Sequence, residues 1–149
     1  MIHLGDSNLF LALTVEQHSH HAAAAVWFRH LEYSDTLCFC RATHISFLRL
    51  LTQAIAPGYR PLTNRQAWAV LDQLHTDEAI GFEAEPDGLD AMWRLLSETD
   101  LASPKVWMDA YLASLAIVAQ RRLVTFDQDF RRFQSHGLDL LILPTAAHD

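Results

Sequence analysis

The stretch Ile2-His3-Leu4-Gly5-Asp6-Ser7-Asn8 opens the chain with a short apolar run that stops at a glycine and an aspartate. A run of this length bounded by a turn signal is typical of a buried strand. Apolar residues recur from Leu9 to Leu13, which predicts a short helix directly after the strand, capped by Asp6 or Ser7. The strand therefore ends on a carboxylate, at the kind of sheet edge where α/β proteins collect ligands.

The same alternation of short apolar runs and helical patterns continues to the end of the chain. Further strands are predicted over residues 36–40, 79–82, 123–126 and 140–143. Helices are predicted over residues 20–31, from Thr43 to the Ala56-Pro57-Gly58 stop, from Thr63 or Asn64 through Leu74, from Pro86 through Leu96, over 104–119, and as a turn that begins at Asp127. The pattern predicts an α/β fold with a central parallel sheet flanked by helices.

Length and composition fit one domain spanning residues 1–149. Half of the 149 residues are hydrophobic, enough for a sizeable core without disulfides. Cys38 and Cys40 stand two apart on a predicted strand, so their side chains point the same way and are expected to be buried free thiols. No apolar run approaches the roughly 20 residues that cross a bilayer. We expect a cytoplasmic protein with no membrane partner.

The formal net charge of −7 argues against a broad basic surface that grips nucleic acid without specificity. It does not exclude a nuclease, because an acidic site that binds divalent metal loses negative charge. The pairs Arg121-Arg122 and Arg131-Arg132 leave two alternatives open. They either face a phosphate backbone or are solvated charges at helix ends.

Three aspartates stand out by their apolar surroundings. Asp6 and Asp127 each follow a predicted strand, and Asp109 lies in the strongly apolar segment 104–119. A carboxylate in such surroundings is costly unless it is hydrogen-bonded, paired or bound to metal. One shared cation explains all three more economically than three separate structural roles.

These residues, in this order, resemble a PIN-domain ribonuclease, and more narrowly a VapC-type toxin of a toxin–antitoxin pair. The resemblance covers nearly the whole chain. It rests on four segments: Gly5-Asp6-Ser7-Asn8, Phe47-Leu48-Arg49-Leu50-Leu51-Thr52, Trp107-Met108-Asp109-Ala110-Tyr111-Leu112-Ala113 and Leu123-Val124-Thr125-Phe126-Asp127-Gln128-Asp129-Phe130. It implies a PIN-like fold and a metal-dependent endoribonuclease that hydrolyses RNA phosphodiester bonds.

By this resemblance, Asp6, Asp109 and Asp127 are the catalytic residues and bind Mg²⁺, with Mn²⁺ as an alternative. Crowded carboxylates raise one another's pKa, and a divalent ion offsets that repulsion while accepting hard oxygen ligands. We expect Asp6 and Asp109 to be direct ligands, and Asp127 to act through water or to orient the nucleophile. Asp129 is either a further carboxylate behind these or a first-turn acid at a helix N-terminus.

The chain departs from the family pattern at Thr43-His44-Ile45-Ser46, because the family usually carries a glutamate there. His44 is expected to occupy that position, either near the metal or as a partly buried residue with a local hydrogen bond. The departure also keeps a second function open, a noncatalytic PIN-like binding module. Ser7 and Asn8 either face the site or simply begin the helix.

The resemblance also implies partners. These are an RNA substrate, a cognate VapB-type antitoxin that covers the acidic groove, and a second copy of the chain in a homodimer. Four apolar side chains of the early helices are candidates for the antitoxin groove or the dimer surface if they are not core: Trp27, Phe28, Phe47 and Leu51.

Overall fold

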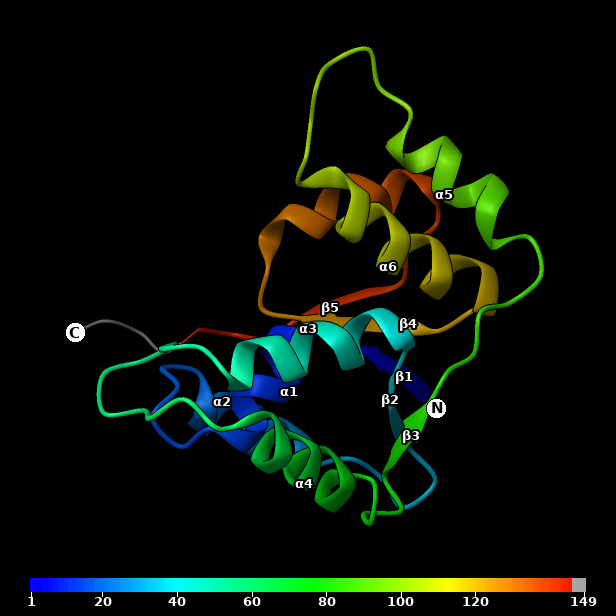
Figure 1. The fold of residues 1–149 in the computed structure, drawn as a ribbon. Helices are drawn as coiled ribbons and strands as arrows, with labels where there is room; N and C mark the ends of the chain where they lie inside the picture. The colour runs from blue at the N-terminus through cyan, green and yellow to red at the C-terminus, as the bar shows by residue number, and fades with distance from the viewer. Residues whose placement is uncertain (146–149) are drawn as a thin grey trace.

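The computed structural model describes residues 1–145, so the last four residues of the predicted domain lie outside the described part. Five parallel strands form one sheet in the order β3-β2-β1-β4-β5 (Figure 1). The strands are β1 (Ile2–Gly5), β2 (Thr36–Phe39), β3 (Ile80–Phe82), β4 (Arg122–Thr125) and β5 (Leu140–Ile142). The predicted α/β fold with a central parallel sheet flanked by helices is confirmed.

Helices cover both faces of this sheet. They are α1 (Ser7–Thr14), α2 (His21–Arg29), α3 (Arg41–Leu51), α4 (Asn64–Leu74), α5 (Leu89–Ser97), α6 (Val106–Ala119) and the 3-10 helix η1 (Gln128–His136). Helices α1 to α4 lie on one side, and α5, α6 and η1 lie on the other (Figure 1). The predicted strand and helix segments therefore all form, although most of their ends shift by one to three residues and α3 ends at Leu51, well before the Ala56-Pro57-Gly58 stop.

Each face has its own hydrophobic core. Phe10 and Phe39 stack with ring centroids 3.5 Å apart beneath α1 and α3, within a core that also buries Phe47 and Leu51 completely or nearly so. Leu4, from the opposite face of β1, packs with α6 and η1. Phe47 and Leu51 are thus core residues and do not form a surface for an antitoxin or a second copy.

Helix α6 lies centrally in the second layer. Its residues from Ala110 to Ala116 are all buried, as its apolar composition predicts. It begins at Val106, two residues after the Pro104 expected from sequence, because Ser103 to Lys105 form a turn in which the Val106 N–H donates to the Ser103 carbonyl. Such shifts are ordinary at helix ends.

Two other helix starts differ from the sequence prediction. Thr43 is not the cap of α3: the helix begins at Arg41, and the Thr43 hydroxyl accepts from the backbone N–H of Cys40, the N-cap. Pro86 belongs to a turn before α5, and Gly88, with φ of 89°, is the N-cap. By contrast, Thr63 caps α4 as predicted, in a reciprocal capping box with Gln66.

The register of β1 against β4 determines where Asp6 lies. Gly5 pairs with Val124 across the two strands, and the Asp6 N–H donates to the Val124 carbonyl at 3.0 Å. Asp6 therefore lies beside the end of β4, from which the chain continues to Asp127.

In residues 1–145, no helix is long and apolar enough to span a membrane.

Candidate acidic active site

Asp6 is a buried carboxylate at the end of β1, with 7% of its surface exposed. The Thr125 hydroxyl donates to its Oδ2 at 2.8 Å, and the Ser7 hydroxyl makes a longer contact of 3.4 Å with Oδ1. Burial raises the pKa of Asp6, against the hydrogen bond from Thr125, and nearby Asp127 raises it further. Ionised Asp6 is therefore costly in the metal-free protein.

Asp6 is the N-cap residue of α1, as predicted, but neither its side chain nor that of Ser7 makes a capping bond.

Thr125 joins Asp6 to Asp127. Its hydroxyl is fully buried, donates to Asp6 and accepts the Asp127 N–H at 3.0 Å. One side chain thus fixes the positions of two carboxylates that are far apart in sequence. The sequence alone indicated no role for Thr125. The signal that could have found it was a lone hydroxyl at the end of an apolar strand, two residues before a candidate ligand.

Asp127 is the N-cap of η1. Its Oδ1 accepts the backbone N–H of Asp129 at 2.8 Å, which fixes the orientation of the carboxylate. Asp129 is exposed in the first turn of η1, and its charge contributes to the field at Asp109. Asp129 is therefore a first-turn acid of η1 whose negative charge also acts on Asp109.

Asp109 lies in the first turn of α6 and is partly buried. Arg132 of η1 donates from Nη2 to its Oδ2 at 3.0 Å. Burial raises the pKa of Asp109 to about 6, the Arg132 guanidinium opposes this rise, and Asp127, Asp6 and Asp129 add to it. Asp6 and Asp127 therefore lie near enough to Asp109 for their charges to raise its pKa.

The donor chemistry suits a hard divalent cation, since Asp6 and Asp127 follow the ends of β1 and β4, and Asp109 of α6 lies near enough to be repelled by both. Each carboxylate is already engaged: Asp6 by Thr125 and, at longer range, Ser7, Asp109 by Arg132, and Asp127 by a backbone N–H. Within residues 1–145, however, no three His, Cys, Asp or Glu side chains form a ready metal-binding group. Metal binding at the aspartates thus requires side-chain rearrangement.

His44 lies in a histidine–arginine cluster on the α4 side of the sheet. Its ring packs on Phe39 and Phe82, and its Nε2 is 2.9 Å from Nε2 of His75. Arg41 can only donate, so Nδ1 of His44 accepts at 3.1 Å and Nε2 carries the proton shared with His75. Burial, His75 and Arg41 lower the pKa of His44 to about 4.

This environment predicts the result of restoring a carboxylate at position 44. We expect His44→Glu to leave Mg²⁺ affinity within about twofold of the wild-type value, because Arg41 would pair with the new carboxylate on the α4 side of the sheet. Calorimetric titration with Mg²⁺ measures it. Severalfold tighter binding by His44→Glu would instead put position 44 at the metal.

The two arginine pairs have different surroundings. Arg121 and Arg122 lie at the amino end of β4, opposite the aspartates, and pair with Glu83 and Asp139. Arg131 donates to Gln128, also on η1. Only Arg132 of these four therefore contacts a candidate ligand.

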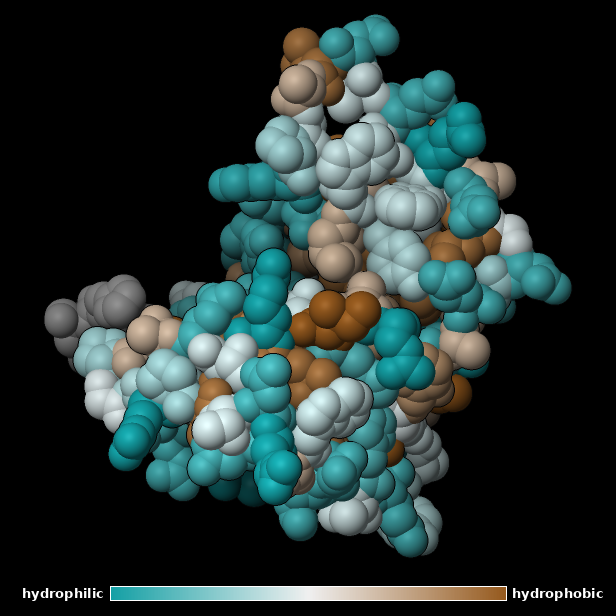
Figure 2. All heavy atoms as spheres, viewed as in Figure 1, coloured by the Kyte–Doolittle hydropathy of each residue, from teal (hydrophilic) through white to brown (hydrophobic). Residues whose placement is uncertain are grey.

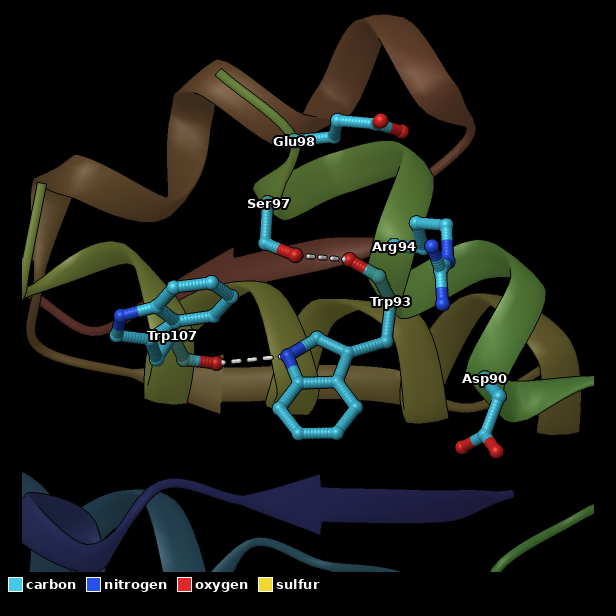
Figure 3. A pocket seen from close by; sticks show the side chains of 6 residues that line it. All are labelled: Asp90, Trp93, Arg94, Ser97, Glu98 and Trp107. Carbon is cyan, nitrogen blue, oxygen red and sulfur yellow. Dashed lines mark hydrogen bonds between the residues drawn. The ribbon is translucent and has the colours of Figure 1, made fainter. Parts of the chain in front are cut away.

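A cavity of about 440 Å³ lies on the α5 side of α6. Figure 3 shows side chains that line it, among them the indoles of Trp93 and Trp107 and the charged groups of Asp90 and Arg94. Trp93 Nε1 donates to the Trp107 carbonyl at 3.0 Å, which ties α5 to the start of α6. The cavity is lined by none of the three aspartates, so it is separate from the acidic site.

The family model of the PIN domain matches residues 4–135, and the chain belongs to this family. Ribonuclease VapC41 of Mycobacterium tuberculosis is 43% identical over 144 residues, covering 94% of this chain and 97% of that protein. The resemblance to VapC-type toxins is confirmed, and it supports the function of a toxin endoribonuclease.

Solved structures agree on the fold. VapBC2 from Rickettsia felis, bound to a DNA fragment from its promoter, matches with a TM-score of 0.70 and 16% identity, covering 97% of this chain and 100% of that one. VapC20 of M. tuberculosis, described as a sarcin-ricin loop cleaving toxin, matches with a TM-score of 0.63 and 17% identity over 93% and 96%. At these identities the likeness concerns the fold alone.

Proposed function

We propose that this protein is a VapC-type toxin that hydrolyses RNA phosphodiester bonds with Mg²⁺ or Mn²⁺ held by Asp6, Asp109 and Asp127, within one PIN-like domain of residues 1–149. The observation that carries the proposal is the buried carboxylate of Asp6, linked through Thr125 to Asp127 and placed in the same electrostatic field as Asp109. Thr125 and Arg132 compensate these acids only in part, since burial still raises the pKa of Asp6 and of Asp109.

Each side chain has its own part in this proposal. Asp6 and Asp109 are proposed as direct ligands, and Thr125 and the η1 N-terminus hold Asp6 and Asp127 in place. Asp127 keeps one carboxylate oxygen for a water molecule, which it orients toward the phosphorus. A divalent ion held by these residues would lower the pKa of that water and stabilise charge on the phosphate.

The direct test is cleavage of total cellular RNA by antitoxin-free protein with Mg²⁺, with Mn²⁺ and with EDTA. We expect discrete fragments with at least one of the two metals and none with EDTA. Absence of cleavage with both metals, together with absence of metal binding in calorimetry, would favour the noncatalytic binding module.

Metal binding should depend on pH because Asp109 binds a proton with a pKa of about 6 in the metal-free protein. The proton and the metal compete at Asp109, so protonation of this carboxyl alone lowers the affinity roughly tenfold per pH unit below about pH 6. Calorimetry with Mg²⁺ between pH 5 and 8 measures this fall. An affinity that stays constant down to pH 5 would remove Asp109 from the ligand set.

A VapB-type antitoxin is the proposed partner, and the cytoplasm the proposed location. Related folds occur in VapBC2 of R. felis and in VapBC-1 of nontypeable Haemophilus influenzae, whose names pair a toxin with an antitoxin. The net charge of −7 and the acidic site suit a basic inhibitory segment.

The proposed homodimer contact lies on the α5–α6 layer. Leu101, Trp107 and Met108 are 78%, 57% and 44% exposed there, and an apolar groove runs between α6 and Ala42 of α3. Figure 2 shows apolar residues at the surface in this hollow. Exposed apolar area of this kind marks association surfaces.

We expect Trp107→Ala to shift the protein from dimer to monomer in light scattering, because it removes the largest exposed apolar side chain of this face. Trp68→Ala on α4, where Trp68 is 54% exposed, is the matched control and should stay dimeric. Equal masses for wild type and Trp107→Ala would place the contact elsewhere or remove the dimer.

A further inference from the structure

Arg132 brings a fixed positive charge into the acidic site. Its Nη2 lies 3.0 Å from Oδ2 of Asp109, and its guanidinium carbon lies 4.8 Å from the ring centroid of Phe133. Phe133 is only 3% exposed and anchors this part of η1 in the core under α6. The arginine is therefore held on two sides, by a carboxylate and by a buried aromatic ring.

The neighbouring arginine provides a contrast. Arg131 carries the same charge one residue earlier, but its Nε donates to Gln128 within η1. The Arg132–Asp109 contact joins η1 to α6 across 23 residues and is partly shielded, with side-chain exposures of 44% and 23%. The chain therefore sets one particular arginine against one particular carboxylate.

Arg132 and a metal ion at Asp109 would compete for the same carboxylate. Asp109 Oδ2 is occupied by a guanidinium, and this positive charge repels a divalent ion at the same carboxylate. The charge of Arg132 also offsets the repulsion that Asp6, Asp127 and Asp129 exert on Asp109. Arg132 thus stabilises the metal-free site and opposes its loading.

We propose that Arg132 is the resident counter-ion of the acidic site, which pairs with Asp109 in the metal-free protein and competes with the divalent cation for that carboxylate. This inference rests on the proposed function, since it requires a metal at Asp109. It assigns Arg132 a regulatory role: the arginine raises the metal concentration at which the site becomes loaded.

The test is calorimetric titration of Mg²⁺ into the full chain at pH 8, well above the pKa of about 6 of Asp109, the carboxyl that Arg132 contacts. Arg132→Gln removes the contact, and Arg131→Gln removes the same charge one residue away. We expect Arg132→Gln to bind Mg²⁺ about 3- to 10-fold more tightly than wild type, and Arg131→Gln to stay within about twofold of wild type. Thermal unfolding confirms that each variant is folded, and Arg132→Lys, which keeps the charge without the planar fork, should give an affinity between wild type and Arg132→Gln.

The direction of the change in affinity decides between the outcomes. Unchanged or weaker binding by Arg132→Gln, or equal tightening by both glutamine variants, would overturn the counter-ion while leaving the proposed metal site intact. No Mg²⁺ binding by any of the proteins would overturn the proposed function itself, and with it the counter-ion.

Discussion

Asp6→Asn and Asp109→Asn should each abolish metal-dependent RNA cleavage, with losses of roughly 10²- to 10⁴-fold, while the protein stays folded. The loss follows because each substitution removes a charged ligand from a site where the metal contributes several kcal/mol to the transition state. Cleavage of total RNA under saturating Mg²⁺ measures the effect. Asp139→Asn, the same change on an exposed residue at the opposite end of β4, should cleave like wild type.

The same substitution at Asp6 should stabilise the metal-free protein. The pKa of Asp6 is raised in the folded state, so its ionisation opposes folding, and this penalty shrinks as pH falls below the folded pKa and is gone below the unfolded pKa of about 3.8. The asparagine side chain of Asp6→Asn is uncharged, so it carries no such penalty and still accepts the Thr125 hydroxyl. We therefore expect the Tm of Asp6→Asn in EDTA at pH 7 to exceed that of wild type by a few degrees, on the order of 3 °C per kcal/mol. A loss of both activity and stability would mean that Asp6 is a structural acid.

Thr125→Val should weaken Mg²⁺ binding by about 10- to 100-fold and lower stability by about 1–3 kcal/mol. Valine fits the space but cannot donate to Asp6 or accept the Asp127 N–H, so a buried carboxylate and a backbone donor both lose their partner. Calorimetry and thermal unfolding in EDTA separate the two effects.

The matched control for Thr125 is Ser114→Ala in α6. The Ser114 hydroxyl is also fully buried, but has no hydrogen-bond partner within the described residues. Its removal should leave metal affinity unchanged and cost little stability, because no hydrogen bond is broken. Equal metal affinities for Thr125→Val and wild type would show that Thr125 does not position the ligands.

Much of the fold could be predicted from sequence because its signals are local. Apolar runs ending at Gly5-Asp6 and Phe126-Asp127 marked two strands, and the unbroken apolar character of residues 104–119 marked the central helix. Cys38 and Cys40 are buried free thiols as predicted, although Cys40 is the N-cap of α3 and only Cys38 lies in the strand.

The long-range contacts could not be predicted in this way. The bridge from Thr125 to Asp6 spans 119 residues and depends on the register of β1 against β4. The contact of Arg132 with Asp109 depends on how η1 packs on α6. His44 shows the same limit: the sequence left it either near the metal or partly buried with a local hydrogen bond, and only the packing shows its ring against His75 and Phe39.

A crystal structure of the protein soaked with Mn²⁺ would decide whether Asp6, Asp109 and Asp127 share one divalent cation. We predict an anomalous difference peak with carboxylate oxygens of Asp6 and Asp109 at about 2.0–2.3 Å, Asp127 within reach through water, and the Arg132 contact to Asp109 broken. A peak at other residues, or none at a Mn²⁺ concentration that supports RNA cleavage, would contradict the shared site.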